Sequence, residues 1–421
     1  MANEPTAASS GPGAARARLI QPLRLRRFAF LWAGQGISVF GDQFYLVALP
    51  WLTLQITGSG LALGTVLMAA AGSRAVFMLP GGALSDRFSP RKLMILSNVA
   101  RALLVGLLVA LLVVGRLQFL HLYLLGLAFG TVDALFYPAY RAILPMLVGD
   151  DELEAGNALL QGTGQMAMLV GPAPAGLLIA RAGLPATFGL AAASFALAAA
   201  LLWAMPEGQR RIAGSSQQTQ AASLWGDIAQ GLRYAWRDPV IRAVLLIIAV
   251  LDFCVVGAAD VGFPWLAERR FPQGAVALGA MFSAWGGGAL LGTVIGGSIR
   301  RPRYLGPFFL GIAALTGLGL ILVGFAPSLA WVTAILVAMG AGSGVLNVVG
   351  VSWLQARTDP SMLGRVMSLV MFASLGLSPL ALALAGLVVD ISATALFVGA
   401  GVIILLGMGA AALVPTMRRM A

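Results

Sequence analysis

Long apolar segments, separated by short polar ones, run through almost the whole chain of 421 residues. An α-helix needs roughly 20 apolar residues to cross the hydrocarbon core of a bilayer, and twelve segments reach that length. They cover residues 28–54, 60–84, 93–115, 120–143, 155–180, 184–205, 241–266, 275–299, 305–326, 329–353, 366–389 and 394–415. The pattern predicts an all-α integral membrane protein with twelve transmembrane helices.

Basic residues lie almost entirely on one side of these predicted spans. The segment between the second and third spans carries Arg87, Arg91 and Lys92, and the N-terminal tail and the central polar segment on the same side are also rich in arginine. The opposite side carries only Arg116, Arg181, Arg269 and Arg270. Because short loops rich in Lys and Arg stay in the cytoplasm, we expect both termini to be cytoplasmic.

The chain divides into two similar parts. The Pro-Trp-Leu sequence at 50–52 recurs at 264–266, and Ala-Gly-Leu at 175–177 recurs at 385–387. We therefore expect two six-helix bundles, residues 28–205 and 241–415, which are pseudo-repeats. Between them we expect a cytoplasmic linker, residues 206–240, with an amphipathic helix, and at the ends a disordered cytoplasmic tail, 1–27, and a second tail, 416–421. This is the plan of secondary transporters whose substrate site lies where the halves meet.

Composition excludes several other classes of protein. The chain is 59% hydrophobic and 10% charged, whereas soluble domains are about 25% charged. With one cysteine, Cys254, and one histidine, His121, it offers no disulfide framework and no histidine-based metal or catalytic cluster. No phosphate-binding loop for ATP is present, so we expect neither an enzyme nor a cofactor. The net charge of +11 lies in short loops, where it sets membrane orientation and does not indicate nucleic acid.

The turn at 82–92 carries a recognisable motif. Gly82, Asp86, Arg87, Arg91 and Lys92 resemble the signature between helices 2 and 3 of the major facilitator superfamily, with Ser and Pro at 89 and 90 as departures. The resemblance implies the twelve-helix major facilitator fold.

The same resemblance implies a conformational role for this turn. Asp86 is expected to lie near Arg365, at the cytoplasmic start of span 11, where helix N–H groups attract an anion. Breaking that contact would favour opening to the cytoplasm. The alternative is a solvated acid that only helps to set topology.

A second motif lies in span 5. Gly171, Pro172, Pro174 and Gly176 resemble the signature of proton-driven drug exporters, although a kinked packing helix explains the same residues. Weaker similarities at 144–145, 150–153, 231–234 and 364–366 resemble the exporter branch that includes macrolide-efflux and enterobactin-export proteins. This resemblance implies multi-pass insertion in a bacterial inner membrane and export of amphiphilic small molecules in exchange for protons.

Three acids fall deep inside predicted spans: Asp42, Asp133 and Asp252. A carboxylate in hydrocarbon is costly, so each is a candidate proton carrier. The alternative is a structural ion pair, for which Arg74 and Arg101 are the available partners. Asp260 and Asp390 lie near predicted helix ends and are expected to be solvated boundary residues.

Polar and aromatic residues at similar depth are candidates for an amphiphile-binding cavity. They are Gln35, Tyr45, Tyr137, Gln165, Phe253, Trp285 and Asn347. We expect a monomer that exports an amphiphilic small molecule by proton antiport and alternating access within the lipid bilayer. Two alternatives are a lipid or lysolipid transporter of the same fold and a non-transporting membrane sensor.

Overall fold

The computed structural model of the chain describes residues 20–206, 232–299, 304–359 and 362–413, and only the backbone of residues 79–80 and 82–87. Over these ranges the chain forms helices and no strands. The elements are η1 (Gln21–Arg24), α2 (Arg26–Thr57), α3 (Gly60–Arg87), α4 (Pro90–Val113), α5 (Phe119–Ile143), η2 (Leu144–Met146), η3 (Asp150–Glu152), α6 (Leu153–Val170), α7 (Pro172–Ala204), α9 (Pro239–Gly257), η4 (Ala258–Gly262), α10 (Phe263–Arg269), α11 (Ala275–Ser298), α12 (Leu305–Gly324), α13 (Leu329–Arg357), α14 (Leu363–Leu375), α15 (Ser378–Ile391) and α16 (Ala393–Leu413).

Among the described residues, 11 helical segments are long and apolar enough to cross a membrane. One of them, α7, contains the end of the fifth predicted span and nearly all of the sixth, and the chain turns between them at Gly183, which has a positive φ of 81°. Gly171 lies against Gln43 of α2, whereas Ala191 lies against Gly41, so the chain returns to the same height on α2. The fifth crossing is α6 with the start of α7, and the sixth is the remainder of α7. The twelve predicted crossings are therefore all present.

Two crossings are interrupted. The seventh consists of α9, the π-helical segment η4 and α10, and the eleventh consists of α14 and α15, which are separated near Gly376. Short π segments inside helices often mark functional sites, because they change the direction of the side chains that follow.

The predicted turn at 82–92 is wrong in its extent. Helix α3 continues through Arg87, and α4 begins at Pro90, so only residues 88 and 89 connect them. Pro90 occupies the first turn of α4, where a missing N–H costs little. Motif residues 82–87 are therefore the last turns of a helix.

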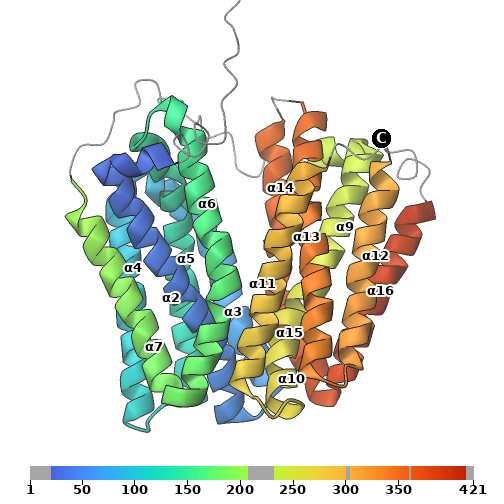
Figure 1. Cartoon of the computed structure of the whole chain (residues 1–421), viewed down its shortest axis with the longest axis horizontal. Helices are drawn as coiled ribbons and strands as arrows, with labels where there is room; N and C mark the ends of the chain where they lie inside the picture. Colours follow the sequence, from blue (N-terminus) through green and yellow to red (C-terminus); the bar gives the residue numbers. More distant parts are fainter. Residues whose placement is uncertain (1–19, 207–231, 300–303, 360–361, 414–421) are drawn as a thin grey trace, which may run out of the picture.

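The helices form two bundles, α2–α7 and α9–α16, which we call the N-half and the C-half (Figure 1). The halves contact each other mainly through α3 with α15, and through α6 and α7 with α11. Both contacts depend on glycine. A methyl group on Gly64 would clash with the carbonyl oxygen of Leu382, and one on Gly279 would clash with that of Pro172.

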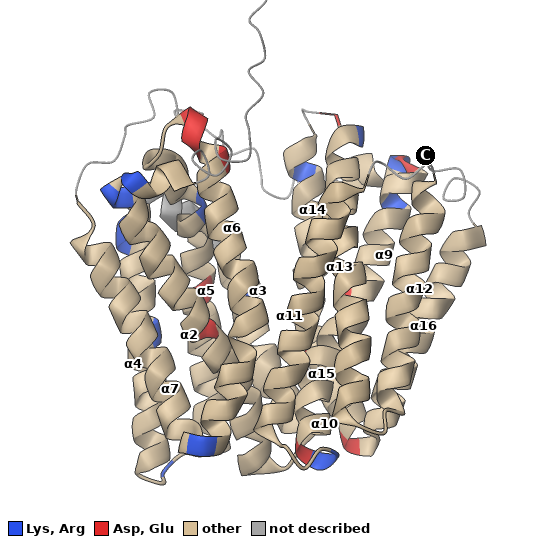
Figure 2. Cartoon of the chain, in the orientation of Figure 1, with Lys and Arg blue, Asp and Glu red and all other residues tan. Residues whose placement is uncertain are grey.

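These contacts lie toward one end of the molecule. Gly60 and Gly64 are in the first turns of α3, just after the turn at Gly58, and Ala275 and Gly279 are in the first turns of α11. We call this end the Gly58 end. Figure 2 shows that most described Lys and Arg residues gather at the opposite end, which we call the basic end.

Candidate functional site: a charge cluster and a cavity

The interior of the N-half holds a cluster of two acids and two bases on four helices. Arg101 of α4 is 1% exposed and forms ion pairs with Asp133 of α5 and with Asp42 of α2, the latter at 3.7 Å. Arg74 of α3 pairs with the other carboxylate oxygen of Asp133 at 3.3 Å. The two acids are each 28% exposed, so they are accessible while the central guanidinium is not.

Three phenyl rings surround the Arg101 guanidinium. Its central carbon lies 4.4 Å from the ring centre of Phe136, 5.5 Å from that of Phe129 and 5.7 Å from that of Phe195. Ring faces attract a cation and exclude water from it. Arg101 is therefore fixed by aromatic packing as well as by its two acids.

The sequence of α4 places Arg101 on a buried face. Ser97, Asn98, Arg101, Val105 and Leu108 are all buried and recur at helical spacing. The Ser38 hydroxyl of α2 donates a hydrogen bond to the Asn98 amide oxygen at 3.0 Å. This polar contact lies one turn from Arg101 and joins the same two helices.

Asp260 is partly buried next to the contact between the halves, whereas the sequence predicted a solvated boundary residue. It lies in η4 of the C-half, which contacts α3. Leu67 and Ala71 of α3 pack in the same apolar cluster as Val261, and Arg74 follows one turn later on that face. Arg74 thus lies on the face of α3 that packs against the segment containing Asp260.

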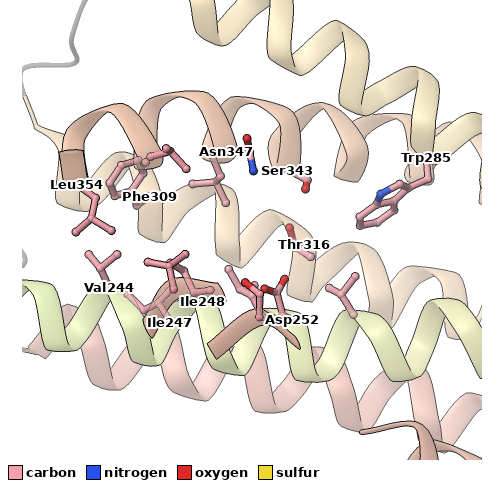
Figure 3. Close-up of a pocket in the computed structure, with 17 residues that line it drawn as sticks. Val244, Ile247, Ile248, Asp252, Trp285, Phe309, Thr316, Ser343, Asn347 and Leu354 are labelled. Atoms are coloured by element: carbon pink, nitrogen blue, oxygen red, sulfur yellow. The ribbon is translucent and has the colours of Figure 1, made fainter. Parts of the chain in front are cut away.

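The C-half contains a cavity of about 220 Å³ between α9, α11, α12, α13 and α14 (Figure 3). Its polar lining residues are Asp252, Trp285, Thr316, Ser343, Asn347 and Ser374. Its apolar lining residues include Val244, Ile247, Ile248, Phe309 and Leu354. The cavity is therefore a largely apolar space with one carboxylate.

The residues proposed from the sequence for a substrate cavity do not come together as one site. Trp285 and Asn347 line the C-half cavity. Tyr45 is buried and stacks on Phe129 with ring centres 4.1 Å apart, next to the charge cluster. The remaining residues are dispersed: Gln35 is buried with an unpaired side-chain oxygen, Tyr137 is exposed and accepts a hydrogen bond from Arg141, and Gln165 and Phe253 are partly buried.

The motif residues of span 5 lie where the halves cross. The Ala173 N–H donates a hydrogen bond to the Ser283 hydroxyl of α11 at 3.0 Å. A methyl group on Gly176 would clash with the carbonyl oxygen of Ala275. The motif thus forms a close crossing of helices between the halves.

The structure describes the side chains of only part of the motif at 82–92. Arg91 donates hydrogen bonds to the carbonyl oxygens of Leu202 at 2.9 Å and Trp203 at 2.6 Å, which satisfies the end of α7. Lys92 is exposed, and Arg365 lies at the start of α14. Side chains 82–87 lie outside the described residues, so the expected contact of Asp86 with Arg365 stays a prediction.

Sequence reasoning missed the phenyl rings around Arg101. Phe129, Asp133 and Phe136 are spaced by four and three residues on α5, so they share one helix face, and this spacing was an available signal. Phe195 had no such signal, because it comes from α7. In the part of the chain that is described, no group of three metal-ligating His, Cys, Asp or Glu side chains comes together.

Comparison with known proteins identifies relatives over most of the chain. The sequence model of the Major Facilitator Superfamily matches residues 31–378. The chain is 26% identical over 381 residues to the multidrug efflux pump Tap of Mycolicibacterium fortuitum, covering 88% of this chain and 89% of Tap. It is 27% identical over 342 residues to the enterobactin exporter EntS of Shigella boydii, covering 80% of this chain and 79% of EntS.

Solved structures show the same fold at low sequence identity. The nucleoside transporter NupG superposes with a TM-score of 0.68 at 12% identity, over 92% of this chain and 99% of NupG. A bacterial homologue of the human lysosomal transporter Spinster, in an inward-facing and occupied conformation, superposes with a TM-score of 0.69 at 12% identity, over 93% of this chain and 97% of that chain.

Proposed function

Because this chain belongs to the Major Facilitator Superfamily, whose members are membrane transporters, we propose that it exports amphiphilic small molecules across a bacterial inner membrane in exchange for protons. The observation that carries the proposal is the Asp42–Arg101–Asp133–Arg74 cluster inside the membrane-spanning helices. The similarity to Tap and EntS, both named as exporters, supports the direction of transport.

The cluster couples proton binding to its ion pairs, because its formal charges balance only when both acids are ionised. With both acids ionised, two carboxylates face two guanidinium groups. A proton on Asp133 removes one negative charge and leaves Arg74 without its partner in the N-half. An unpaired ion at this depth is costly, so protonation must change the energy of the surrounding helices.

Arg74 connects this change to the other half. Arg74 lies on the face of α3 that packs against η4, which contains Asp260 of the C-half. Protonation of Asp133 would release Arg74 to attract Asp260 across the halves, and proton release would return Arg74 to Asp133. A coupling of this kind is what alternating access requires, because a bound ion must favour one arrangement of the halves over the other.

The positive-inside rule supports the orientation. Most described Lys and Arg residues lie at the basic end, so we assign that end to the cytoplasm. The Gly58 end, where the halves contact each other, is then periplasmic. In this arrangement the contacts of α3 with α15 and of α7 with α11 close the periplasmic side.

The experiment is uptake of an amphiphilic rhodamine dye by inside-out membrane vesicles, with and without a pH gradient, for the wild type, Asp42→Asn and Asp133→Asn. We expect uptake to require the gradient and to fall at least about tenfold in one or both variants, as for loss of a proton-transfer group. Asp150→Asn, in the exposed turn η3, is the matched control and should behave as wild type.

Gradient-independent uptake would contradict proton antiport. Absence of dye movement in wild-type vesicles, together with transfer of a fluorescent lysolipid between leaflets, would instead support the lipid transporter. Absence of both, with intact folded protein, would support the non-transporting sensor.

A further inference from the structure

Asp252 differs from Asp42 and Asp133 in having no basic partner among the described residues. Asp42 forms an ion pair with Arg101, and Asp133 forms ion pairs with Arg101 and Arg74. Among the residues that the structure describes, no Lys or Arg pairs with Asp252, and none lines its cavity. An unpaired carboxylate inside a membrane protein marks a path for protons or a binding site for a cation from elsewhere.

Three hydroxyl groups line the cavity with Asp252, those of Thr316, Ser343 and Ser374, and the Thr316 hydroxyl has already used its proton. The Thr316 hydroxyl donates to the carbonyl oxygen of Ile312, one turn earlier on α12, at 3.2 Å. The Thr316 hydroxyl therefore presents lone pairs to the cavity. The cavity lining around Asp252 therefore favours a ligand with N–H donors.

The polar side chains of Asp252, Thr316, Ser343 and Asn347 lie along the middle of the cavity. Figure 3 shows Asp252 in the middle, with Val244, Ile247 and Ile248 toward one end and Trp285 toward the other. A quaternary ammonium group, which has no N–H, is recognised by a cage of aromatic rings. Here the only aromatic lining residues are Trp285 and Phe309, and Figure 3 shows them near opposite ends.

We propose that the C-half cavity binds the protonated amine of an amphiphilic substrate, with Asp252 as its counter-charge and Thr316 as a further acceptor. The volume of about 220 Å³ is smaller than the ~300–1,000 Å³ of pockets that hold whole drug-sized ligands. It therefore accommodates the amine and part of its apolar chain. This inference rests on the proposed export function and names its substrate class.

The test is equilibrium binding to the full-length protein in nanodiscs, measured by titration calorimetry with three matched probes. They are phenylhexyl-dimethylamine, which is protonated at neutral pH, its N-methylated quaternary analogue, and phenylhexanol. Loss of one charge-assisted hydrogen bond corresponds to about tenfold in affinity or more, so the amine should bind at least that much more tightly than the quaternary ion. The neutral alcohol should bind more weakly still.

Two variants test the assignment of the residues. Asp252→Asn should lower the affinity for the amine at least about tenfold and remove its advantage over the quaternary ion. Thr316→Val keeps the side-chain shape and should reduce that advantage by a smaller factor. Asp150→Asn, outside the cavity, should match wild type.

Equal binding of the amine and the quaternary ion, equal binding of the alcohol, or an unchanged preference in a folded Asp252→Asn protein would each overturn the proposal. Export itself is checked separately by rhodamine uptake. If uptake still requires the pH gradient while the amine preference is absent, the substrate inference fails and the proposed function stands.

Discussion

The Asp390 carboxylate at the end of α15 accepts a hydrogen bond from the Gly60 backbone N–H at the start of α3, at 2.6 Å. The same carboxylate accepts from the Leu61 N–H at 2.9 Å and from the Ser59 hydroxyl at 2.9 Å. The first N–H groups of a helix have no partner within it, and an anion there is favoured by the helix dipole. A residue of the C-half therefore caps a helix of the N-half.

Replacing this acid should loosen the contact between the halves. Removing an N-cap acceptor costs roughly 0.5–2 kcal/mol. The hydrogen bonds of Asp390 join the two halves. Their loss therefore raises the free energy of the arrangement in which the halves are in contact at the Gly58 end. Asp390→Ala should shift the population away from that arrangement by about 2- to 30-fold, measured as the distance distribution between spin labels placed on α3 and α15.

The matched control is Asp150→Ala, which removes an exposed acid from the opposite end of the N-half. It should leave the distance distribution unchanged. If Asp390→Ala gives the wild-type distribution, the three hydrogen bonds of Asp390 contribute nothing to closure.

A second prediction concerns the glycine crossing of α3 and α15. A Cβ atom on Gly64 would overlap the carbonyl oxygen of Leu382, which is rigid backbone, so the helices must separate. Gly64→Val should therefore weaken the contact between the halves at least as strongly as Asp390→Ala in the same spin-label measurement. Gly106→Val on α4 is the control, because a Cβ atom there meets nothing within 4 Å. A wild-type distribution for Gly64→Val would mean that the α3–α15 crossing is not a fixed contact.

The apolar pattern predicted the helices well because each crossing must be apolar over its whole length in a bilayer. It predicted the turn at 82–92 poorly, since a polar surface segment can be helical, and α3 runs to Arg87. The interruption at η4 had no visible signal, because the apolar run continues through it. Hydropathy reports depth in the membrane and says little about local backbone geometry.

The candidate site was predictable one residue at a time but not as an assembly. Asp42, Asp133, Arg74 and Arg101 stood out as charges in apolar segments, and the structure brings all four together. The roles of Asp260 and Asp390 could not be read from sequence. Both depend on how one half lies against the other, and that arrangement leaves no periodic signal in either helix.

A third prediction tests the central arginine. Removing one partner from a buried ion pair typically costs 3–5 kcal/mol, whereas replacing the whole group by apolar residues costs far less. Arg101→Met keeps the volume but leaves Asp42 and Asp133 without their shared cation. It should lower the thermal stability of the purified protein markedly.

The double variant Arg101→Met, Asp42→Asn should recover most of that stability, because Asp133 keeps Arg74 as its partner and no charge remains unpaired. A structural role for side-chain size alone predicts no recovery. Equal melting temperatures for Arg101→Met and wild type would show that protonation of Asp42 and Asp133 compensates for the lost arginine at no net cost in stability.

A fourth prediction concerns pH and lies outside the membrane spans, at Asp238. This carboxylate accepts from the Val240 N–H at 2.8 Å and the Ile241 N–H at 3.3 Å, and from Arg357 at 3.0 and 3.1 Å. Partial burial alone would raise the pKa of Asp238, but these hydrogen bonds and the Arg357 charge outweigh it and hold the pKa below the ordinary 3.8. The folded state therefore prefers the ionised form.

The direction of the pH effect on stability follows from this preference for the ionised form. A carboxyl with a lowered pKa in the folded state stabilises the fold fully above its ordinary pKa, and the contribution is lost as pH falls below about 3.8. Asp238→Asn keeps one acceptor for the start of α9 but removes the charge, so it should cost roughly 1 kcal/mol at neutral pH. The difference in melting temperature between wild type and Asp238→Asn should shrink as pH is lowered through this range. A difference that stays constant down to about pH 3 would mean that the ion pair with Arg357 does not hold α9 to α13.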